Sequence, residues 1–454
     1  MKILLVTSFF PPTHTAGTEK RTLGYAKSLQ RLGHTVQVIC AGEWDRGDRY
    51  WNGFTDEVYQ QITVRRLHLN WTLAPDPNRY LYNNPIVEKY MENWLGELKP
   101  DVVHITSCVS LSASVIQAAR NCNVPVVLTL TDFWFICPRI NLLKGDGSLC
   151  DGRTTAWDCL ECTLWNTKAL RVLNSAFSPA IAAKTLTMVS RSPALNKQRG
   201  LRGMAFDMED RKAYLTRMIR SADCVTAPSA LLSETVNACL NTELVKVIHS
   251  GHDLTWLDGF RPVKRGDRIR IAYIGQIIPI KGVHLLLSAF LLAGLEKKAE
   301  LFVYGDQDKD PLYFEQLKDL NSGQKVPVQF KGSFSHEQLG EILSGIDVLV
   351  VPSLWHENNP RVIQEAFAAK IPVIASNVGG ISEFVKHEVN GLLFERDSIE
   401  DLSKQLRRIV SDTDLLVSLQ AGMTPVRSVD DEIAEFEAIY KELVADVSTP
   451  KIKV

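Results

Sequence analysis

Short apolar runs of strand length alternate with segments of helical periodicity along this chain, and the whole pattern occurs twice. The first set of runs is KILLVTSF, TVQVICA, DVVHITS and PVVLTLTDF, and the second is IRIAYIG, ELFVYGD, VQFKGSF, VLVVPS and PVIASN. Apolar strands separated by helices are typical of a parallel sheet covered by helices on both faces. The pattern therefore predicts an α/β fold with two doubly wound, Rossmann-like sheets and a central cleft between them.

The two sets of runs also indicate where the domains lie. A length of 454 residues is too great for one ordinary domain and fits two of about 200 residues each. A polar linker near residues 257–268 separates the first set from the second. We therefore expect one domain over 1–257, a second over 258–429 and a final helical segment over 430–454.

Composition excludes several classes of protein. Hydrophobic residues make up 45% of the chain and charged residues 23%, which is usual for a soluble globular protein. The net charge of -1 argues against a nucleic-acid partner, and no apolar run reaches the roughly 18 residues of a membrane span. The first apolar run has no cleavage site and leads into a glycine loop, so we interpret it as a strand. A cytoplasmic location follows, where cysteines are thiols or metal ligands more often than disulfides.

Residues 351–385 include two glutamates eight positions apart, Glu357 and Glu365, and a pair of glycines. Glu357 follows a buried apolar run, and Glu365 lies more than one turn inside the helical segment that comes next. Gly379 and Gly380 follow another apolar run, where the missing side chains allow backbone to approach a ligand closely. Ligands of open α/β sheets bind beyond the carboxyl ends of the strands, so we expect these residues to converge on one ligand. Two solvated surface glutamates are the alternative.

This segment resembles the donor-site motif of the retaining glycosyltransferases of family 4, which have the two-domain GT-B fold. In that family the first glutamate of a Glu-x7-Glu motif lies near the donor sugar, and the second hydrogen-bonds the nucleotide ribose. The resemblance implies these roles for Glu357 and Glu365, and it adds Asn358 and Asn359 to the donor-binding residues. Residues 430–454 resemble the final GT-B helix, which crosses back to the N-terminal domain.

A departing nucleotide diphosphate needs positive charge nearby, because negative charge develops on it in the transition state. Lys281 directly precedes a helix whose amino terminus can also face phosphate. The family usually has Arg or Lys at the position of Gln276, so one expected charge is missing. Gly17 lies in a loop like the family's glycine-containing loop, where backbone N–H groups approach the diphosphate or the acceptor. A solvated lysine and an ordinary strand-to-helix turn are the alternatives for Lys281 and Gly17.

The acceptor side is marked less clearly. His104 and Asp132 each come at the end of an apolar run, from which they could face the cleft. Many relatives carry histidines at the positions of Thr106 and Thr131, and both are absent here. We expect Asp132 to orient an acceptor hydroxyl, and His104 is either catalytic or a core histidine with satisfied hydrogen bonds.

An insertion over about 135–220 contains four cysteines with the spacing C-x12-C-x8-C-x2-C. They are Cys137, Cys150, Cys159 and Cys162. Four thiolates suit tetrahedral Zn²⁺, and they could also hold an iron–sulfur cluster. Since all four would be ligands, the site would be structural, and no metal or cofactor is expected for catalysis. Disulfides or free thiols are the alternative, and related transferases with a similar insertion favour a structural metal.

Residues 163–206 contain no Asp or Glu but several Lys and Arg among apolar residues. Such a stretch suits an interfacial helix attracted to an anionic membrane surface, where many family members act on lipid-linked acceptors. An amphipathic helix packed on the first domain explains the same residues, and the sequence leaves the two alternatives open.

The resemblance implies transfer of a hexose from a nucleotide diphosphate sugar to a glycan or lipid-linked acceptor hydroxyl, with retention at the anomeric carbon. Such a reaction would serve the synthesis of cell-surface polysaccharide or glycolipid. A nucleotide-sugar epimerase shares the fold and is one alternative. A degenerate sugar-nucleotide-binding scaffold is the other, since Gln276 and the missing histidines depart from the family pattern.

Overall fold

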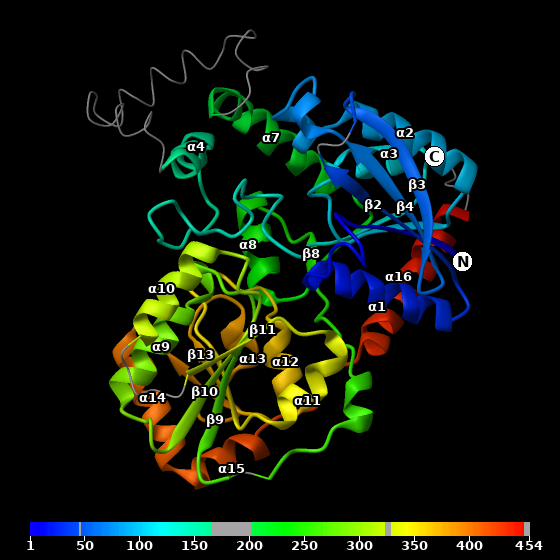
Figure 1. Ribbon diagram of the computed structural model, residues 1–454. Coiled ribbons are helices and arrows are strands. Elements are labelled where there is room, and N and C mark those ends of the chain that lie inside the picture. Colours follow the sequence, from blue (N-terminus) through cyan, green and yellow to red (C-terminus); the bar gives the residue numbers. More distant parts are fainter. Residues whose placement is uncertain (45–46, 166–200, 265, 323–327, 449–454) are drawn as a thin grey trace, which may run out of the picture. The chain divides into compact units, whose positions relative to one another are not determined.

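The chain forms two compact units in a computed structural model that describes residues 1–44, 47–165, 201–264, 266–322 and 328–448 (Figure 1). The N-terminal unit comprises Met1–His249 together with the C-terminal helix α16 (Val429–Ser448), and the C-terminal unit comprises Ser250–Ser428. The basic stretch over 163–206 falls mostly on residues 166–200, outside the described residues. Its expected contact with a membrane therefore stays a prediction.

The N-terminal unit is built on an eight-stranded sheet with the order β3-β4-β2-β1-β5-β6-β7-β8. Its strands are β1 (Lys2–Val6), β2 (Thr35–Trp44), β3 (Trp51–Tyr59), β4 (Ile62–Leu69), β5 (Val102–Ile105), β6 (Val126–Thr129), β7 (Cys224–Ala227) and β8 (Val245–Val247). Neighbouring strands are parallel except for β3, which forms an antiparallel hairpin with β4 at one edge. The chain leaves β1 toward β2 on one side and toward β5 on the other, so the strand order reverses between β1 and β5.

Helices cover both faces of this sheet, and the strands are accordingly apolar on both sides. The helices are α1 (Gly17–Arg31), α2 (Pro85–Leu98), α3 (Ser114–Asn121), α4 (Ala156–Leu164), α7 (Leu201–Ser221), α8 (Ala230–Leu240) and α16. Along β1, Leu4 and Val6 belong to one core cluster, while Ile3 and Leu5 belong to the other. Helix α16 contributes Phe436 to the cluster of Ile3 and Leu5, so the last helix completes the core around the first strand.

The C-terminal unit contains a six-stranded parallel sheet with the order β11-β10-β9-β12-β13-β14. Its strands are β9 (Ile269–Ile274), β10 (Ala299–Tyr304), β11 (Val328–Gly332), β12 (Val348–Val351), β13 (Val373–Ser376) and β14 (Gly391–Phe394). Its helices are α9 (Val283–Ala293), α10 (Pro311–Asn321), α11 (Leu339–Ser344), α12 (Arg361–Ala368), α13 (Ile381–Phe384), α14 (Ile399–Ser411) and α15 (Thr413–Ala421). Here the strand order reverses between β9 and β12, so the ends of these two strands are where a ligand is expected.

Both units are therefore α/β, as the alternating apolar runs predicted. The sheet of the C-terminal unit is parallel throughout, and that of the N-terminal unit is parallel except for the edge strand β3. In the part of the chain that the structure describes, no helix is long and apolar enough to cross a membrane.

Candidate functional site

Glu357 lies in the loop after β12, at the reversal point of the C-terminal sheet, and its carboxylate is held by three donors. Its Oε1 accepts hydrogen bonds from Lys281 Nζ at 2.6 Å, Ser353 Oγ at 2.7 Å and Trp355 Nε1 at 2.8 Å. Within the described residues Oε2 accepts none. Burial raises the pKa of this carboxyl, but the Lys281 ammonium and the hydrogen bonds outweigh burial and lower the pKa below its ordinary value. Glu357 is therefore a buried carboxylate that is ionised at neutral pH, with one oxygen left for a ligand.

Lys281 reaches Glu357 from the short 3₁₀ turn Pro279–Lys281 that follows β9. The turn ends in Gly282, whose φ is +71° and where an added Cβ would lie 1.9 Å from the carbonyl oxygen of Pro352. Only glycine allows this approach of the turn to the end of β12. The ammonium also lies 5.0 Å from the centre of the Trp355 ring. Two segments that are distant in the sequence thus place a cation beside a carboxylate.

Gly379 and Gly380 follow β13 and pack against the backbone that carries Glu357. A Cβ at Gly379 would lie 2.8 Å from the Glu357 nitrogen, and one at Gly380 would lie 2.4 Å from the Asn358 oxygen. The Gly380 N–H also donates to the Glu357 carbonyl at 2.6 Å. The close approach expected of these glycines is therefore made to the protein's own loop, which holds the carboxylate in place.

The other residues expected in the donor site also lie at this edge of the C-terminal unit. Glu365 is one turn inside α12, with its Oε1 3.8 Å from Arg361 Nε. Asn359 has a buried side-chain oxygen that accepts no hydrogen bond from any described residue. Gln276 follows β9 with an exposed side chain, and its carbonyl accepts a hydrogen bond from Tyr273 Oη at 2.6 Å. The position at which the family usually has a cation is therefore open to solvent.

His104 and Asp132 belong to the N-terminal unit and have different environments. His104 is fully buried, with Nδ1 2.5 Å from Tyr440 Oη and Nε2 2.8 Å from Thr129 Oγ1. Burial lowers the pKa of this imidazole to about 3, and the nearby charge of Arg21 acts in the same direction. These are the contacts of a neutral core histidine, because neither nitrogen is left for an acceptor hydroxyl.

Asp132 follows β6 in the loop after Thr129, and its Oδ1 accepts the Trp134 N–H at 2.8 Å. Burial raises the pKa of this carboxyl to about 6, although the Trp134 N–H and the charge of Arg211 oppose the shift. Asp132 is therefore a carboxyl that changes its charge near neutral pH.

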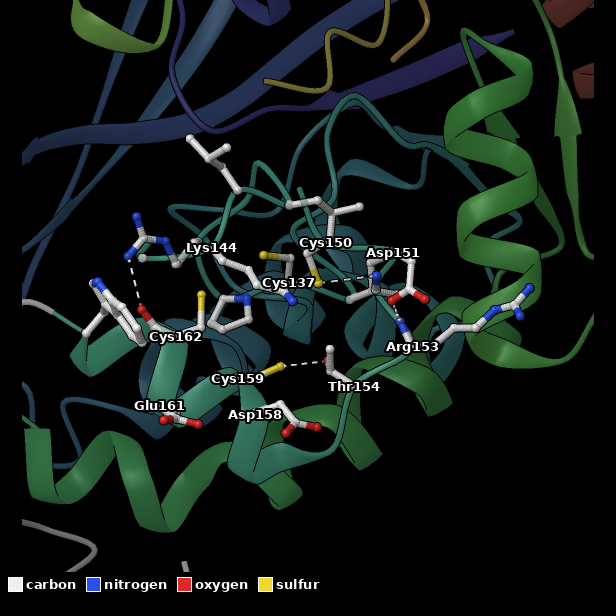
Figure 2. Close-up of a pocket in the computed structure, with 18 of the residues that line it drawn as sticks. Cys137, Lys144, Cys150, Asp151, Arg153, Thr154, Asp158, Cys159, Glu161 and Cys162 are labelled. Carbon is white, nitrogen blue, oxygen red and sulfur yellow. Dashed lines mark hydrogen bonds between the residues drawn. The ribbon is translucent and has the colours of Figure 1, made fainter. Parts of the chain in front are cut away.

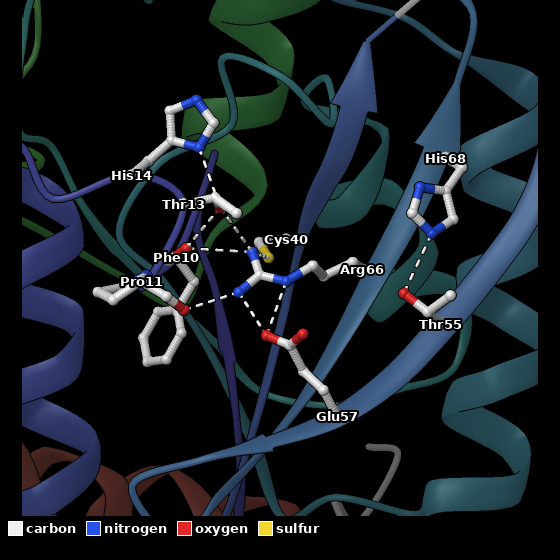
Figure 3. Close-up of polar contacts among 9 residues, drawn as sticks. All are labelled: Phe10, Pro11, Thr13, His14, Cys40, Thr55, Glu57, Arg66 and His68. Carbon is white, nitrogen blue, oxygen red and sulfur yellow. Dashed lines mark hydrogen bonds and ion pairs between the residues drawn. The ribbon is translucent and has the colours of Figure 1, made fainter. Parts of the chain in front are cut away.

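The loop between β1 and α1 is held by Arg66, a residue that the sequence did not single out (Figure 3). Arg66 is buried on β4, where it donates to the carbonyls of Phe10 at 3.1 Å and Pro11 at 2.7 Å. It also pairs with Glu57 of the neighbouring strand at 2.6 Å. Gly17 itself opens α1, whose N-terminal residue makes no side-chain cap. The edge hairpin thus fixes the chain that leads from β1 into this uncapped helix.

The four cysteines of the insertion line one cavity of about 410 Å³ (Figure 2). All nine cysteines of the chain are described, and none forms a disulfide. Among the described residues, no three His, Cys, Asp or Glu side chains converge closely enough to hold a metal ion. The thiols therefore share a cavity without forming a ligand sphere, and the metal site stays a prediction.

Comparison with known proteins shows the family to which both regions of the chain are similar. Residues 16–251 match the model of the glycosyl transferase 4-like domain, and residues 256–422 match that of the glycosyl transferases group 1. An uncharacterized glycosyltransferase of Methanocaldococcus jannaschii is 30% identical over 91% of this chain and 90% of its own length. The lipopolysaccharide 1,2-N-acetylglucosaminetransferase of Salmonella typhimurium is 29% identical over 44% of this chain and 51% of its own.

Solved structures share the fold at low sequence identity. Sucrose-phosphate synthase from Thermosynechococcus elongatus matches with a TM-score of 0.67 and 20% identity, over 98% of this chain and 99% of that one. Anabaena HepE, solved in complex with UDP and glucose, matches with a TM-score of 0.62 and 17% identity, over 97% and 100%. These neighbours confirm the GT-B class predicted for the fold.

Proposed function

This chain belongs to the glycosyltransferases, with a glycosyl transferase 4-like region followed by a group 1 region, and we propose that it is a retaining hexosyltransferase. It would move a hexose from a nucleotide diphosphate sugar to a hydroxyl of a glycan or lipid-linked acceptor. Relatives include a transferase of lipopolysaccharide synthesis, which supports an acceptor of cell-surface polysaccharide or glycolipid.

The carboxylate of Glu357 carries this proposal. Three donors occupy Oε1, and no described residue donates to Oε2, so the second oxygen can accept a hydrogen bond from a hydroxyl of the donor sugar. The lowered pKa keeps Glu357 ionised, which suits an acceptor of hydrogen bonds and excludes a proton donor near neutral pH. Glu357 therefore positions the sugar rather than protonating the leaving group.

Lys281 would stabilise the leaving diphosphate while it orients Glu357. An ammonium has three N–H donors, and the described residues use one of them on Glu357 Oε1. The side chain of Lys281 keeps 22% of its surface exposed, so the remaining donors can reach a phosphate oxygen. Negative charge on the leaving group would then be matched by a cation that is already in place before the reaction.

Retention follows from the family resemblance, which implies attack on the same face of the sugar that the diphosphate leaves. In this route the departing phosphate accepts the proton of the acceptor hydroxyl, and the protein supplies position and charge. Glu365 would hold the nucleotide ribose, and Asp132 would orient the acceptor hydroxyl. The raised pKa of Asp132 means that this second role depends on pH.

A panel of UDP, GDP, ADP and dTDP sugars tests the proposal. We expect one nucleotide class to raise the melting temperature, since a ligand at 100 times its Kd adds about 2.7 kcal/mol of stability. With an acceptor, NMR of the product should show the anomeric configuration of the donor. Stabilisation by none of the sugars would count against the donor site, inversion would overturn retention, and a converted sugar without acceptor would indicate an epimerase.

A further inference from the structure

The four cysteines around the cavity of Figure 2 have no part in the proposed reaction. We propose that Cys137, Cys150, Cys159 and Cys162 bind one structural Zn²⁺ ion, which staples the insertion of the N-terminal unit. The inference is independent of the transferase activity. We call this group of residues the thiol pocket.

Backbone hydrogen bonds bring the thiol pocket together from three short segments. Cys137 ends a turn in which its N–H donates to Phe133 O at 2.7 Å, and the Cys150 N–H donates to Leu142 O at 2.8 Å beside a small hairpin. Cys159 and Cys162 lie three positions apart on α4, which places both thiols on one face of the helix. A turn, a hairpin and a helix thus bring all four thiols to the wall of one cavity, although they are not yet close enough together to coordinate an ion.

Close packing at a glycine supports this convergence. An added Cβ at Gly145, in the tip of the hairpin, would lie 2.9 Å from the carbonyl oxygen of Cys162. Arg139 Nη1 donates to the same oxygen at 3.3 Å. The hairpin that carries Cys150 therefore lies directly against the end of the helix that carries Cys162.

Two of the sulfurs already have hydrogen-bond partners of the kind that orient metal ligands. The Gly152 N–H donates to Cys150 Sγ at 3.4 Å from a turn in which Gly152 has a φ of +78°. Thr154 Oγ1 lies 3.0 Å from Cys159 Sγ. Hydrogen bonds donated to a sulfur stabilise the charge on a thiolate and fix its direction toward the metal.

Charged side chains of both signs line the thiol pocket. Zn²⁺ with four thiolates carries a net charge of about −2. Lys144, Arg139 and Arg153 line the cavity, and Arg211 interacts electrostatically with Cys137 and Cys159. Four carboxyl side chains also line the cavity, namely Asp146, Asp151, Asp158 and Glu161. Three of them accept hydrogen bonds within their own turns, Asp146 from Ser148, Asp151 from the Arg153 N–H and Asp158 from Thr155.

The first segment of the insertion packs into the main core of the unit through Phe135, Cys137 and Leu142. Helix α4 has only a small core, so a metal would tie α4 to that segment. The core cluster of α4 consists of the buried residues Leu160, Leu164 and Met208. Segments with so small a core usually need a disulfide or a metal to hold one conformation. Because the cavity is larger than an ion, Zn²⁺ would draw the sulfurs inward to about 2.3 Å, and the turns at Gly147 and Gly152 can adjust.

Metal analysis of the full chain, purified under reducing conditions without chelators, tests the inference. We expect about one equivalent of zinc, lost in Cys150→Ser and Cys162→Ser. Cys239→Ser is the matched control, since its Sγ would lie 2.7 Å from a Cβ added at Gly152 although it is outside the thiol pocket. The control should keep its zinc.

A second measurement does not depend on whether the variants fold. In the wild-type chain, the four thiols should react with a thiol reagent only after a strong chelator removes the zinc, and Co²⁺ should replace it with the spectrum of tetrahedral thiolate coordination. Zinc far below one equivalent, iron with labile sulfide, disulfides among these cysteines, or loss of zinc from Cys239→Ser would each overturn the proposal.

Discussion

Glu357 in the C-terminal unit and Asp132 in the N-terminal unit both follow the carboxyl end of a buried parallel strand, yet their pKa values move in opposite directions. Burial raises the pKa of Asp132 to about 6, against the opposing effects of the Trp134 N–H and Arg211. Burial also acts on Glu357, but Lys281 and two further donors lower its pKa. Both residues thus occupy the same place in an α/β unit. Glu357 contacts a cation and is ionised at neutral pH, whereas Asp132 contacts no cation among the described residues and titrates at about pH 6.

This difference separates two kinds of site. The Glu357 site is organised before any ligand arrives, because its charge and its hydrogen bonds are fixed by residues 281, 353 and 355. Asp132 keeps one backbone hydrogen bond to Oδ1 and can gain or lose its charge within the ordinary pH range. Substitutions at the two positions should therefore have different effects, on kcat at Glu357 and on the pH dependence of stability at Asp132.

The largest effect is expected for Glu357→Gln. Glutamine keeps the shape of the side chain and can still accept from Ser353 and Trp355, but it removes the negative charge that holds Lys281. We expect kcat to fall by about 10²–10³, the usual cost of one preorganised electrostatic contact. Steady-state kinetics with the preferred donor and a melting curve would measure this effect.

Glu315→Gln is the matched control for that change. Glu315 is on α10 with 64% of its side chain exposed, and it pairs with Lys318 on the same helix. The control should leave kcat unchanged, because an exposed pair contributes little. If kcat of Glu357→Gln is within tenfold of the wild-type value, the carboxylate is not needed in the transition state.

The next effect concerns the dependence of the free energy of unfolding on pH. The pKa of Asp132 is 3.8 in the unfolded chain and about 6 in the folded protein, so between these pH values the folded protein binds more protons. This residue therefore makes the free energy of unfolding fall as pH rises from 3.8 to about 6. His104 has the opposite effect, because its pKa is 6.5 in the unfolded chain and about 3 in the folded protein. Between these pH values the unfolded chain binds more protons, so this residue makes the free energy of unfolding rise with pH. Each slope is at most about 1.4 kcal/mol per pH unit.

Urea unfolding between pH 4 and 6 would separate the two contributions. Asp132→Asn should make stability rise more steeply with pH than in the wild type, and His104→Gln should make it rise less. Glu357→Gln should leave the slope above pH 5 unchanged, since the pKa of Glu357 is lowered from 4.5. Equal slopes in the wild type and Asp132→Asn would show that Asp132 titrates normally in the folded protein.

The sequence predicted the fold class and the place of Glu357 in a loop after a buried strand, because both depend on local patterns. Apolar runs indicate strands, and the ends of parallel strands indicate where ligands bind. The pairing of Lys281 with Glu357 was not predicted, since it depends on how β9 and β12 adjoin in the sheet. Gly379 and Gly380 were expected to let backbone approach a ligand. The structure shows their close approach to residues 356–358 of the same chain, and the contact with a ligand stays a prediction.

Residues whose contacts come from distant segments could not be assigned from the sequence. His104 looked equally suited to the core and to catalysis, and its environment depends on Tyr440, which lies 336 positions away. Arg66 gave no signal, because its role depends on the pairing of β4 with β3 and on the path of the chain after β1. Side-chain type and periodicity do not carry this information.

A smaller effect is expected for Arg66→Lys, which tests whether the loop before Gly17 belongs to the site. Lysine keeps the charge but cannot donate to Phe10, Pro11 and Glu57 together. Each lost hydrogen bond is worth about 0.5–1.5 kcal/mol, so we expect KM for donor or acceptor to rise about fivefold. Arg65→Lys, on the same strand and paired with Asp56, is the control, and an equal rise in both would assign the effect to the hairpin alone.

The smallest effect, a lower KM for the donor, is expected for Gln276→Arg. The Gln276 side chain is exposed after β9, where a cation would add to the charge of Lys281 if a diphosphate binds there. An exposed charge pair is worth up to about 1 kcal/mol, so KM for the donor should fall by about two- to fivefold, and less at high salt because exposed charges are screened. Gln329→Arg, which adds the same charge at an exposed position of β11, should leave KM unchanged. If both variants lower KM equally, the gain comes from net charge, and Gln276 does not lie beside the diphosphate.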